Sequence, residues 1–113
     1  MSIWMVLKII ATLATAATGL LAFVKPAATY GFIGLNPSSV RGVSEIRAIF
    51  GGLFIALGLA PLFLGTVAYQ MLGIGYLVIA VARLISILFD RSYAQSNIIS
   101  LVIEIVLGII LVI

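Results

Sequence analysis

The sequence predicts an all-α membrane protein, a bundle of four transmembrane helices with a short interfacial segment between the first two. Of the 113 residues, 65% are hydrophobic and only 8% are charged, whereas soluble domains carry about 25% charged residues. The apolar stretches reach the length of roughly 20 residues that a membrane-spanning helix needs. A soluble chain this short could not bury so much apolar surface. We therefore expect a single integral membrane domain, in contact with membrane lipids.

The first apolar segment, residues 3–24, is interrupted only by Lys8, whose long side chain we expect to extend toward the membrane surface. A cleaved signal peptide is the alternative, but no basic region precedes the apolar run. Pro26 should end this first helix. The following stretch, residues 27–35, is apolar and aromatic, which predicts a short interfacial or re-entrant piece.

The second span is expected over residues 45–64, with Ser44 as its N-cap and Glu45 near the positive end of the helix dipole. Pro61 should kink or end it. Small residues recur along this span, a pattern typical of close helix contact in lipid. The expected packing residues are Ala48, Gly52, Ala56 and Ala60 at a spacing of four, with Gly51 and Gly58 on a neighbouring face.

The remaining two spans follow from a long uncharged run. No charge occurs from residue 48 to residue 82, and one straight helix of that length would be far longer than a bilayer is thick. The chain must therefore turn back, and Gly65-Thr66 is the strongest turn signal. We expect the third span over 67–89 and the fourth over 97–113, separated by a polar loop.

The basic residues predict the orientation in the membrane. Four spans place both termini on one side and the loops 25–44 and 90–96 on the other. Most basic residues lie on the loop side, where the positive-inside rule predicts the cytoplasm, with both termini outside. These residues are Lys25, Arg41, Arg47 and Arg91.

The composition excludes several functions. The chain has no Cys and no His, so disulfides, thiolate or imidazole metal sites and the common nucleophile–base pairs are absent. The chain has three acidic residues in total, so few side chains could act in catalysis. We therefore expect that the protein is not an enzyme and that it holds no metal or cofactor. The net charge of +3 comes from scattered residues, so no nucleic-acid partner is indicated.

The candidate site is a set of charged residues within the predicted spans, where ionisable groups are costly and often functional. Arg83 and Glu104 lie at similar depths, about 10 Å from the loop side at 1.5 Å per residue. We expect them to form an ion pair, which Glu45 and Arg47 would extend into a four-residue network. The first interpretation is that this network only stabilises the fold, because buried charges pair to limit the cost of desolvation.

A second interpretation is that the same residues line a polar cavity that binds a small ligand or a quinone headgroup. Tyr76 is seven residues from Arg83, shares its helical face, and is expected to line that cavity together with Ser86. A third interpretation is proton coupling at Glu104. Arg83 argues against it, because a neighbouring cation favours the charged carboxylate.

The motif Glu45-x-Arg-Ala-x-x-Gly-Gly, the later Ala82-Arg83-Leu-Ile-Ser with Asp90, and the late Glu104 together resemble an uncharacterised bacterial family of four-helix membrane proteins. This domain of unknown function is itself distantly DoxX-like. The resemblance spans nearly the whole chain and implies a four-helix fold in the bacterial inner membrane. Members often carry Gly directly after the Asp, where this chain has Arg91. DoxX-like relatives are linked to quinone-dependent redox systems, which implies a quinone or lipid ligand.

Three functions follow, in decreasing order of expectation. The first is a non-enzymatic accessory or scaffold subunit, as a homo-oligomer or together with other membrane subunits. The second is a quinone- or lipid-binding protein that uses the cavity around Arg83 and Glu104. The third is a small transporter. Small multidrug exporters share the length and span number, but their essential Glu lies in the first span, and this first span carries no acid.

Overall fold

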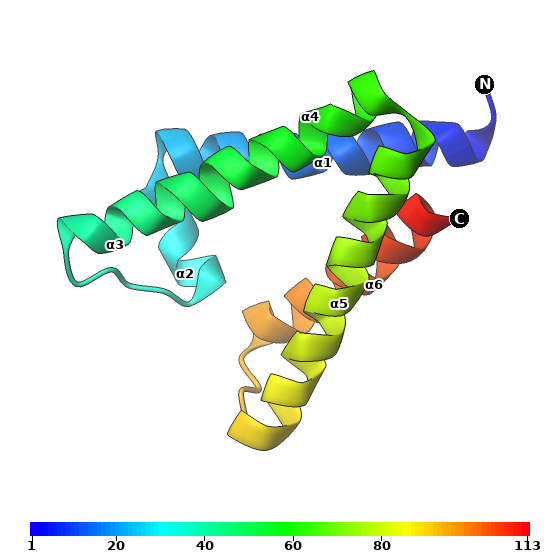
Figure 1. Ribbon diagram of the computed structural model, residues 1–113. Coiled ribbons are helices and arrows are strands. Elements are labelled where there is room, and N and C mark those ends of the chain that lie inside the picture. Colours follow the sequence, from blue (N-terminus) through cyan, green and yellow to red (C-terminus); the bar gives the residue numbers. More distant parts are fainter.

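The computed structural model describes residues 1–113, and it consists of helices joined by short connections (Figure 1). Four helical stretches are long and apolar enough to cross a membrane: Ile3–Val24, Val40–Leu64, Thr66–Asp90 and Gln95–Val112. The predicted all-α class with four such helices is confirmed. The chain is therefore a small multi-pass membrane protein.

The first helix, α1 (Ile3–Val24), begins where Ser2 accepts a hydrogen bond from the Met5 backbone N–H at 3.1 Å, the geometry of a serine N-cap. It ends before Pro26, as expected. A 3-10 turn, η1 (Pro26–Thr29), and the short helix α2 (Tyr30–Ile33) follow. The stretch predicted as interfacial thus forms short helical turns.

The second long helix combines α3 (Val40–Glu45), the π-helical segment η2 (Ile46–Leu53) and α4 (Phe54–Leu64). It begins five residues before the predicted start. Ser39, rather than Ser44, is the N-cap, and its hydroxyl accepts from the Gly42 N–H at 3.2 Å. The helix also continues beyond Pro61 to Leu64.

The third and fourth long helices are α5 (Thr66–Asp90) and α6 (Gln95–Val112). The turn into α5 is at Gly65, where the sequence predicted it, and its φ of 80° and ψ of −150° suit glycine. The turn out of α5 is at Arg91, whose φ of 55° and ψ of 41° place an arginine in the left-handed region. An arginine thus adopts a conformation that glycine reaches without steric cost.

The four helices form two antiparallel hairpins. The helix α1 packs mainly against η2 and α4, and α5 packs mainly against α6. The hairpins meet where α4 joins α5, close to both chain ends, and diverge toward the loops (Figure 1). Contacts between the hairpins are fewer than those within them, and they involve α4 with α5, α1 with α6 and the short helix α2 with α6. The two open ends therefore lie at the 25–39 connection and at the 91–94 loop.

Glycines set the close packing within each hairpin. A Cβ added to Gly51 would lie 2.9 Å from the Phe23 Cβ, and one added to Gly58 would collide with the Ala16 backbone. In the second hairpin, a Cβ at Gly73 would lie 2.9 Å from the Gly108 carbonyl oxygen. Such contacts need the absence of a side chain, which is how small residues let helices associate in lipid.

The packing face of the second long helix differs from the one predicted by a spacing of four. Ala48, Gly52 and Ala56 are exposed, whereas Gly51 and Gly58 are buried. The spacing of four assumes an α-helix throughout. The π-helical turn between residues 46 and 53 takes about five residues, so Ile46 and Gly51 are the buried positions in this segment. Of the six expected packing residues, only Gly51 and Gly58, the two on the neighbouring face, are buried at the helix contact.

The contact face of α1 carries one residue that the sequence placed elsewhere. Ala11, Thr15 and Gly19, which are four residues apart, are buried. Lys8 lies on the same face and is only 9% exposed, so its stem packs between helices rather than extending freely to the membrane surface. It forms no ion pair.

Candidate functional site

The candidate site lies along α5, whose apolar part faces the first hairpin and whose polar part faces α6. Leu72, Tyr76, Ile79, Arg83 and Ser86 follow one another at spacings of three and four, so they share one face of α5. The face changes from apolar to polar toward the 91–94 loop. Two neighbouring cavities line up along it, and Ile79 borders both of them.

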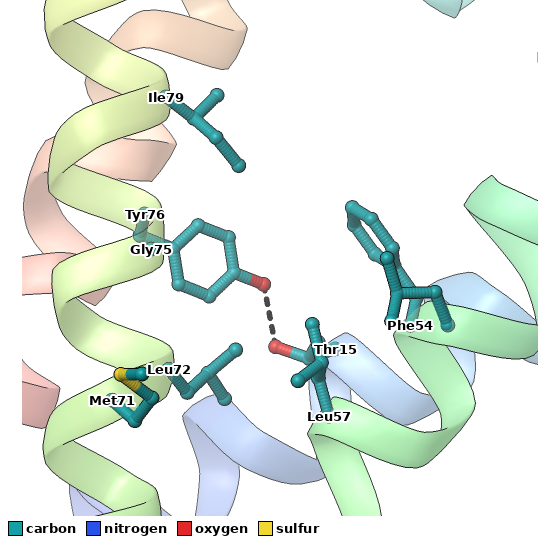
Figure 2. Close-up of a pocket in the computed structure, with 9 residues that line it drawn as sticks. Thr15, Phe54, Leu57, Met71, Leu72, Gly75, Tyr76 and Ile79 are labelled. Carbon is teal, nitrogen blue, oxygen red and sulfur yellow. Dashed lines mark hydrogen bonds between the residues drawn. The ribbon is translucent and has the colours of Figure 1, made fainter.

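The first cavity is apolar and lies between the two hairpins (Figure 2). Its volume is about 130 Å³. Figure 2 shows Tyr76 and Ile79 of α5 facing Phe54 and Leu57 of α4 across the space. The cavity is lined by Thr15, Leu53, Phe54, Leu57, Met71, Leu72, Gly75, Tyr76 and Ile79.

A hydroxyl pair crosses the base of this apolar cavity. The Tyr76 phenol and the Thr15 hydroxyl form a hydrogen bond that joins α5 to α1 (Figure 2). The Thr15 hydroxyl also donates to the Ala11 carbonyl oxygen at 2.9 Å, so the Tyr76 hydroxyl is the donor within the pair. Nearby, Thr12 donates to the Gly58 carbonyl oxygen at 2.6 Å. Threonines on α1 therefore tie it to both α4 and α5.

The second cavity is a larger, open depression with a volume of about 330 Å³, and we term it the polar cavity because three of its five lining side chains are polar. Arg83, Ser86 and Asn97 line it together with Ile79 and Ala82. The inclusion of Ser86 agrees with the prediction. Tyr76 shares the helical face of Arg83 but lines the apolar cavity instead, because it lies about 10 Å further along α5 at 1.5 Å per residue.

The ion pair expected between Arg83 and Glu104 is present. Arg83 Nε donates to Glu104 Oε1 at 2.8 Å and Nη2 donates to Oε2 at 2.7 Å, which is the bidentate geometry that suits guanidinium and carboxylate. The Glu104 side chain is 10% exposed and that of Arg83 is 30% exposed. The pair therefore joins α5 to α6 at the edge of the polar cavity.

Asn97 completes this cluster, and the sequence analysis did not identify it. Its Oδ1 accepts from Arg83 Nη1 at 2.8 Å, while its Nδ2 donates to the Ser92 carbonyl oxygen and hydroxyl. Asn97 thereby links the 91–94 loop to the ion pair. A signal was available, because Asn97 lies seven residues before Glu104 and shares its helical face.

The four-residue network does not form. Glu45 instead pairs with Arg41 at 2.8 Å, and both side chains are more than half exposed. Arg47 donates to the Phe23 carbonyl oxygen at 2.7 Å, one of the last carbonyls of α1, where a cation is favourable. The reason is the arrangement of the hairpins: α3 and η2 pack along α1, away from α5 and α6.

Comparison with known proteins places the chain in a family. A family model described as Domain of unknown function (DUF4345) matches residues 3–113. The chain therefore belongs to this family. No curated protein and no solved structure matches the chain.

Proposed function

We propose that this member of the DUF4345 family is a non-enzymatic membrane protein that binds an amphiphilic molecule of the bilayer, such as a lipid or a quinone. Its apolar tail would occupy the cavity between the hairpins, and its head would lie in the polar cavity beside Arg83. The observation that carries the proposal is the pair of cavities that share Ile79 on one face of α5. Binding sites of this kind are mostly apolar, with a few placed polar groups.

The polar cluster favours this proposal over a purely structural role. A structural pair in lipid is best fully enclosed, because a charge exposed to hydrocarbon is costly. Here the Arg83 side chain is 30% exposed and borders a cavity of about 330 Å³. Asn97 holds the guanidinium from a second side. The cluster is thus rigid but open, as expected of a group that receives a ligand.

The orientation belongs to the same proposal. With the loops 25–44 and 90–96 in the cytoplasm, and both termini outside, the polar cavity would open toward the cytoplasmic side of an inner membrane. An amphiphile would then enter laterally, with its head at the depth of Arg83.

Native mass spectrometry of the protein, released gently from its own membrane, tests the proposal. We expect a retained small amphiphile. The decisive variant is Gly75→Leu: Gly75 lines the apolar cavity, and a Cβ added there meets nothing within 4 Å, so a leucine should fill the cavity without disturbing the backbone. Gly52→Leu is the matched control, because Gly52 lies in another long helix and its nearest neighbour is 3.9 Å away.

The outcomes separate this function from its alternatives. Loss of the retained molecule in Gly75→Leu but not in Gly52→Leu would support the proposal. A stoichiometric complex with other membrane subunits and no small molecule would contradict it and favour the accessory or scaffold role. A particle with neither would leave the small-transporter role as the better hypothesis.

A further inference from the structure

The Arg83 side chain retains hydrogen-bonding capacity beside the polar cavity. A guanidinium has five N–H donors, and three of them are used: one to Glu104 Oε1, one to Glu104 Oε2 and one to Asn97 Oδ1. The other two, one on each terminal nitrogen, have no acceptor within the protein. They belong to a side chain that lines the cavity. A ligand head in this cavity would therefore meet N–H donors.

The charge around these donors is balanced. The Glu104 carboxylate neutralises Arg83 through two direct contacts. The only hydroxyl that lines this cavity, on Ser86, donates to the Asp90 carboxylate at 2.7 Å, which adds a negative charge near the cavity. No other basic residue lines the cavity. Sites that recognise phosphate usually offer a surplus of positive charge, and this one does not. Asn97 lies in the first turn of α6, but its backbone N–H and that of Ile98 donate to the Ala94 carbonyl oxygen.

We infer that the head of the ligand is uncharged and carries carbonyl oxygens that accept the free N–H groups of Arg83. This inference rests on the proposed function, which it makes more specific. Acylglycerol esters and prenyl quinones both have this chemistry. A phosphate head would be attracted by Arg83 but repelled by Glu104 and Asp90, so its desolvation would not be compensated by a net positive charge.

The spacing of the two cavities fits such a molecule. Arg83 and Tyr76 are seven residues apart on α5, which is about 10 Å along the helix axis. A carbonyl held near Arg83 would therefore place the first part of an attached acyl or prenyl chain beside Ile79. A further few carbons would enter the apolar cavity between the hairpins, whose volume of about 130 Å³ admits only part of such a chain.

Two lipids that differ only in a phosphate provide the test. Purified protein in detergent is titrated with dioleoylglycerol, with dioleoyl phosphatidate or with decylubiquinone, and the bound fraction is read by native mass spectrometry. We expect at least one neutral ligand to bind about tenfold more tightly than phosphatidate, because the phosphate loses its hydration at a site without net positive charge. Binding by dioleoylglycerol or by decylubiquinone alone identifies which source of carbonyl the site accepts.

Charge-changing variants test the reason for this preference. In Glu104→Gln the site keeps its shape but gains a net positive charge, so we expect phosphatidate to bind about as well as the neutral ligand. If that variant does not fold, Asp90→Asn provides a second test, since Asp90 is exposed and its replacement should move the ratio in the same direction by a smaller factor. An unchanged ratio in every folded variant would overturn the inference.

The failures of the two proposals are distinguishable. Equal binding of all three ligands, abolished by Gly75→Leu but not by Gly52→Leu, would refute the uncharged head while leaving the amphiphile site intact. Binding of all three that Gly75→Leu does not affect, or no binding at all, would refute both.

Discussion

Arg83 and Glu104 come from adjacent antiparallel helices and meet through two parallel hydrogen bonds of 2.8 and 2.7 Å. Asn97, two turns before Glu104 on α6, accepts a hydrogen bond from the same guanidinium. Because the carboxylate is nearly enclosed while the guanidinium borders a cavity, the pair both fixes the second hairpin and offers donors to a ligand. The contribution of the pair to stability and its role in ligand binding can be tested separately.

The ion pair should show strong coupling between its two members. Removing one partner leaves an uncompensated charge, and for buried pairs this costs about 3–5 kcal/mol. We expect Arg83→Met and Glu104→Leu each to lower stability to that extent, whereas the double variant should be much closer to the native protein. A double-mutant cycle from thermal unfolding in detergent measures the coupling. Additive losses would show that the two side chains do not stabilise each other.

The packing face of the second long helix predicts a contrast between two glycines. A Cβ at Gly58 would collide with the Ala16 backbone, whereas one at Gly52 has its nearest neighbour 3.9 Å away. Gly58→Ala should therefore destabilise the first hairpin by about 1–3 kcal/mol, the usual cost of overpacking. Gly52→Ala should be neutral or stabilise by up to about 1 kcal/mol through helix propensity. Thermal unfolding of both variants checks this, and the reverse order would contradict the packing described above.

The turn after α5 predicts a stabilising substitution. Arg91 has a φ of 55°, a conformation that costs a residue with a Cβ roughly 1 kcal/mol or more. Glycine adopts it without that cost and commonly follows the C-terminus of a helix. We expect Arg91→Gly to raise the free energy of unfolding by about 1 kcal/mol. The comparison variant is Arg91→Ala, which removes the charge but keeps the Cβ, and it should give no such gain.

The hydrogen bond between Thr15 and Tyr76 should couple the two hairpins weakly. Hydrogen bonds between membrane helices contribute about 0.6 kcal/mol on average. Tyr76→Phe and Thr15→Val should each cost about that much, and their combination little more. Few other contacts join the hairpins. We therefore also expect the distribution of distances between spin labels on α3 and on the 91–94 loop to broaden in Tyr76→Phe. An unchanged distance distribution would show that other contacts hold the hairpins together.

Much of the second hairpin was predictable, because its determinants are local. A short polar loop forces α5 and α6 to be antiparallel neighbours, and the depths of Arg83 and Glu104 then follow from counting residues. The same counting would have found Asn97, which lies two turns from Glu104 on the same face. The turn at Gly65 was equally evident, since a long uncharged run must fold back and glycine tolerates the required φ.

The first hairpin was less predictable, because its contacts depend on helix geometry that residue spacing does not reveal. The small residues at a spacing of four suggested a packing stripe through Gly52. The π-helical turn instead shifts the contact to Gly51 and Gly58. In the same way, Glu45 and Arg47 have the charges for a network with Arg83, but α3 and η2 lie on the other hairpin.

The sequence by itself determined that this is a small four-helix membrane protein, where the chain turns back, and which two charges pair within α5 and α6. Those features follow from the length of the apolar segments, the residues at the turns and the positions of charges along each helix. All of these determinants are local in the sequence. Only the tertiary structure decided that the hairpins diverge and that Tyr76 and Arg83 line separate, adjoining cavities. The relative placement of two hairpins depends on contacts between distant residues, such as Thr15 with Tyr76, and no local pattern encodes which distant partners meet.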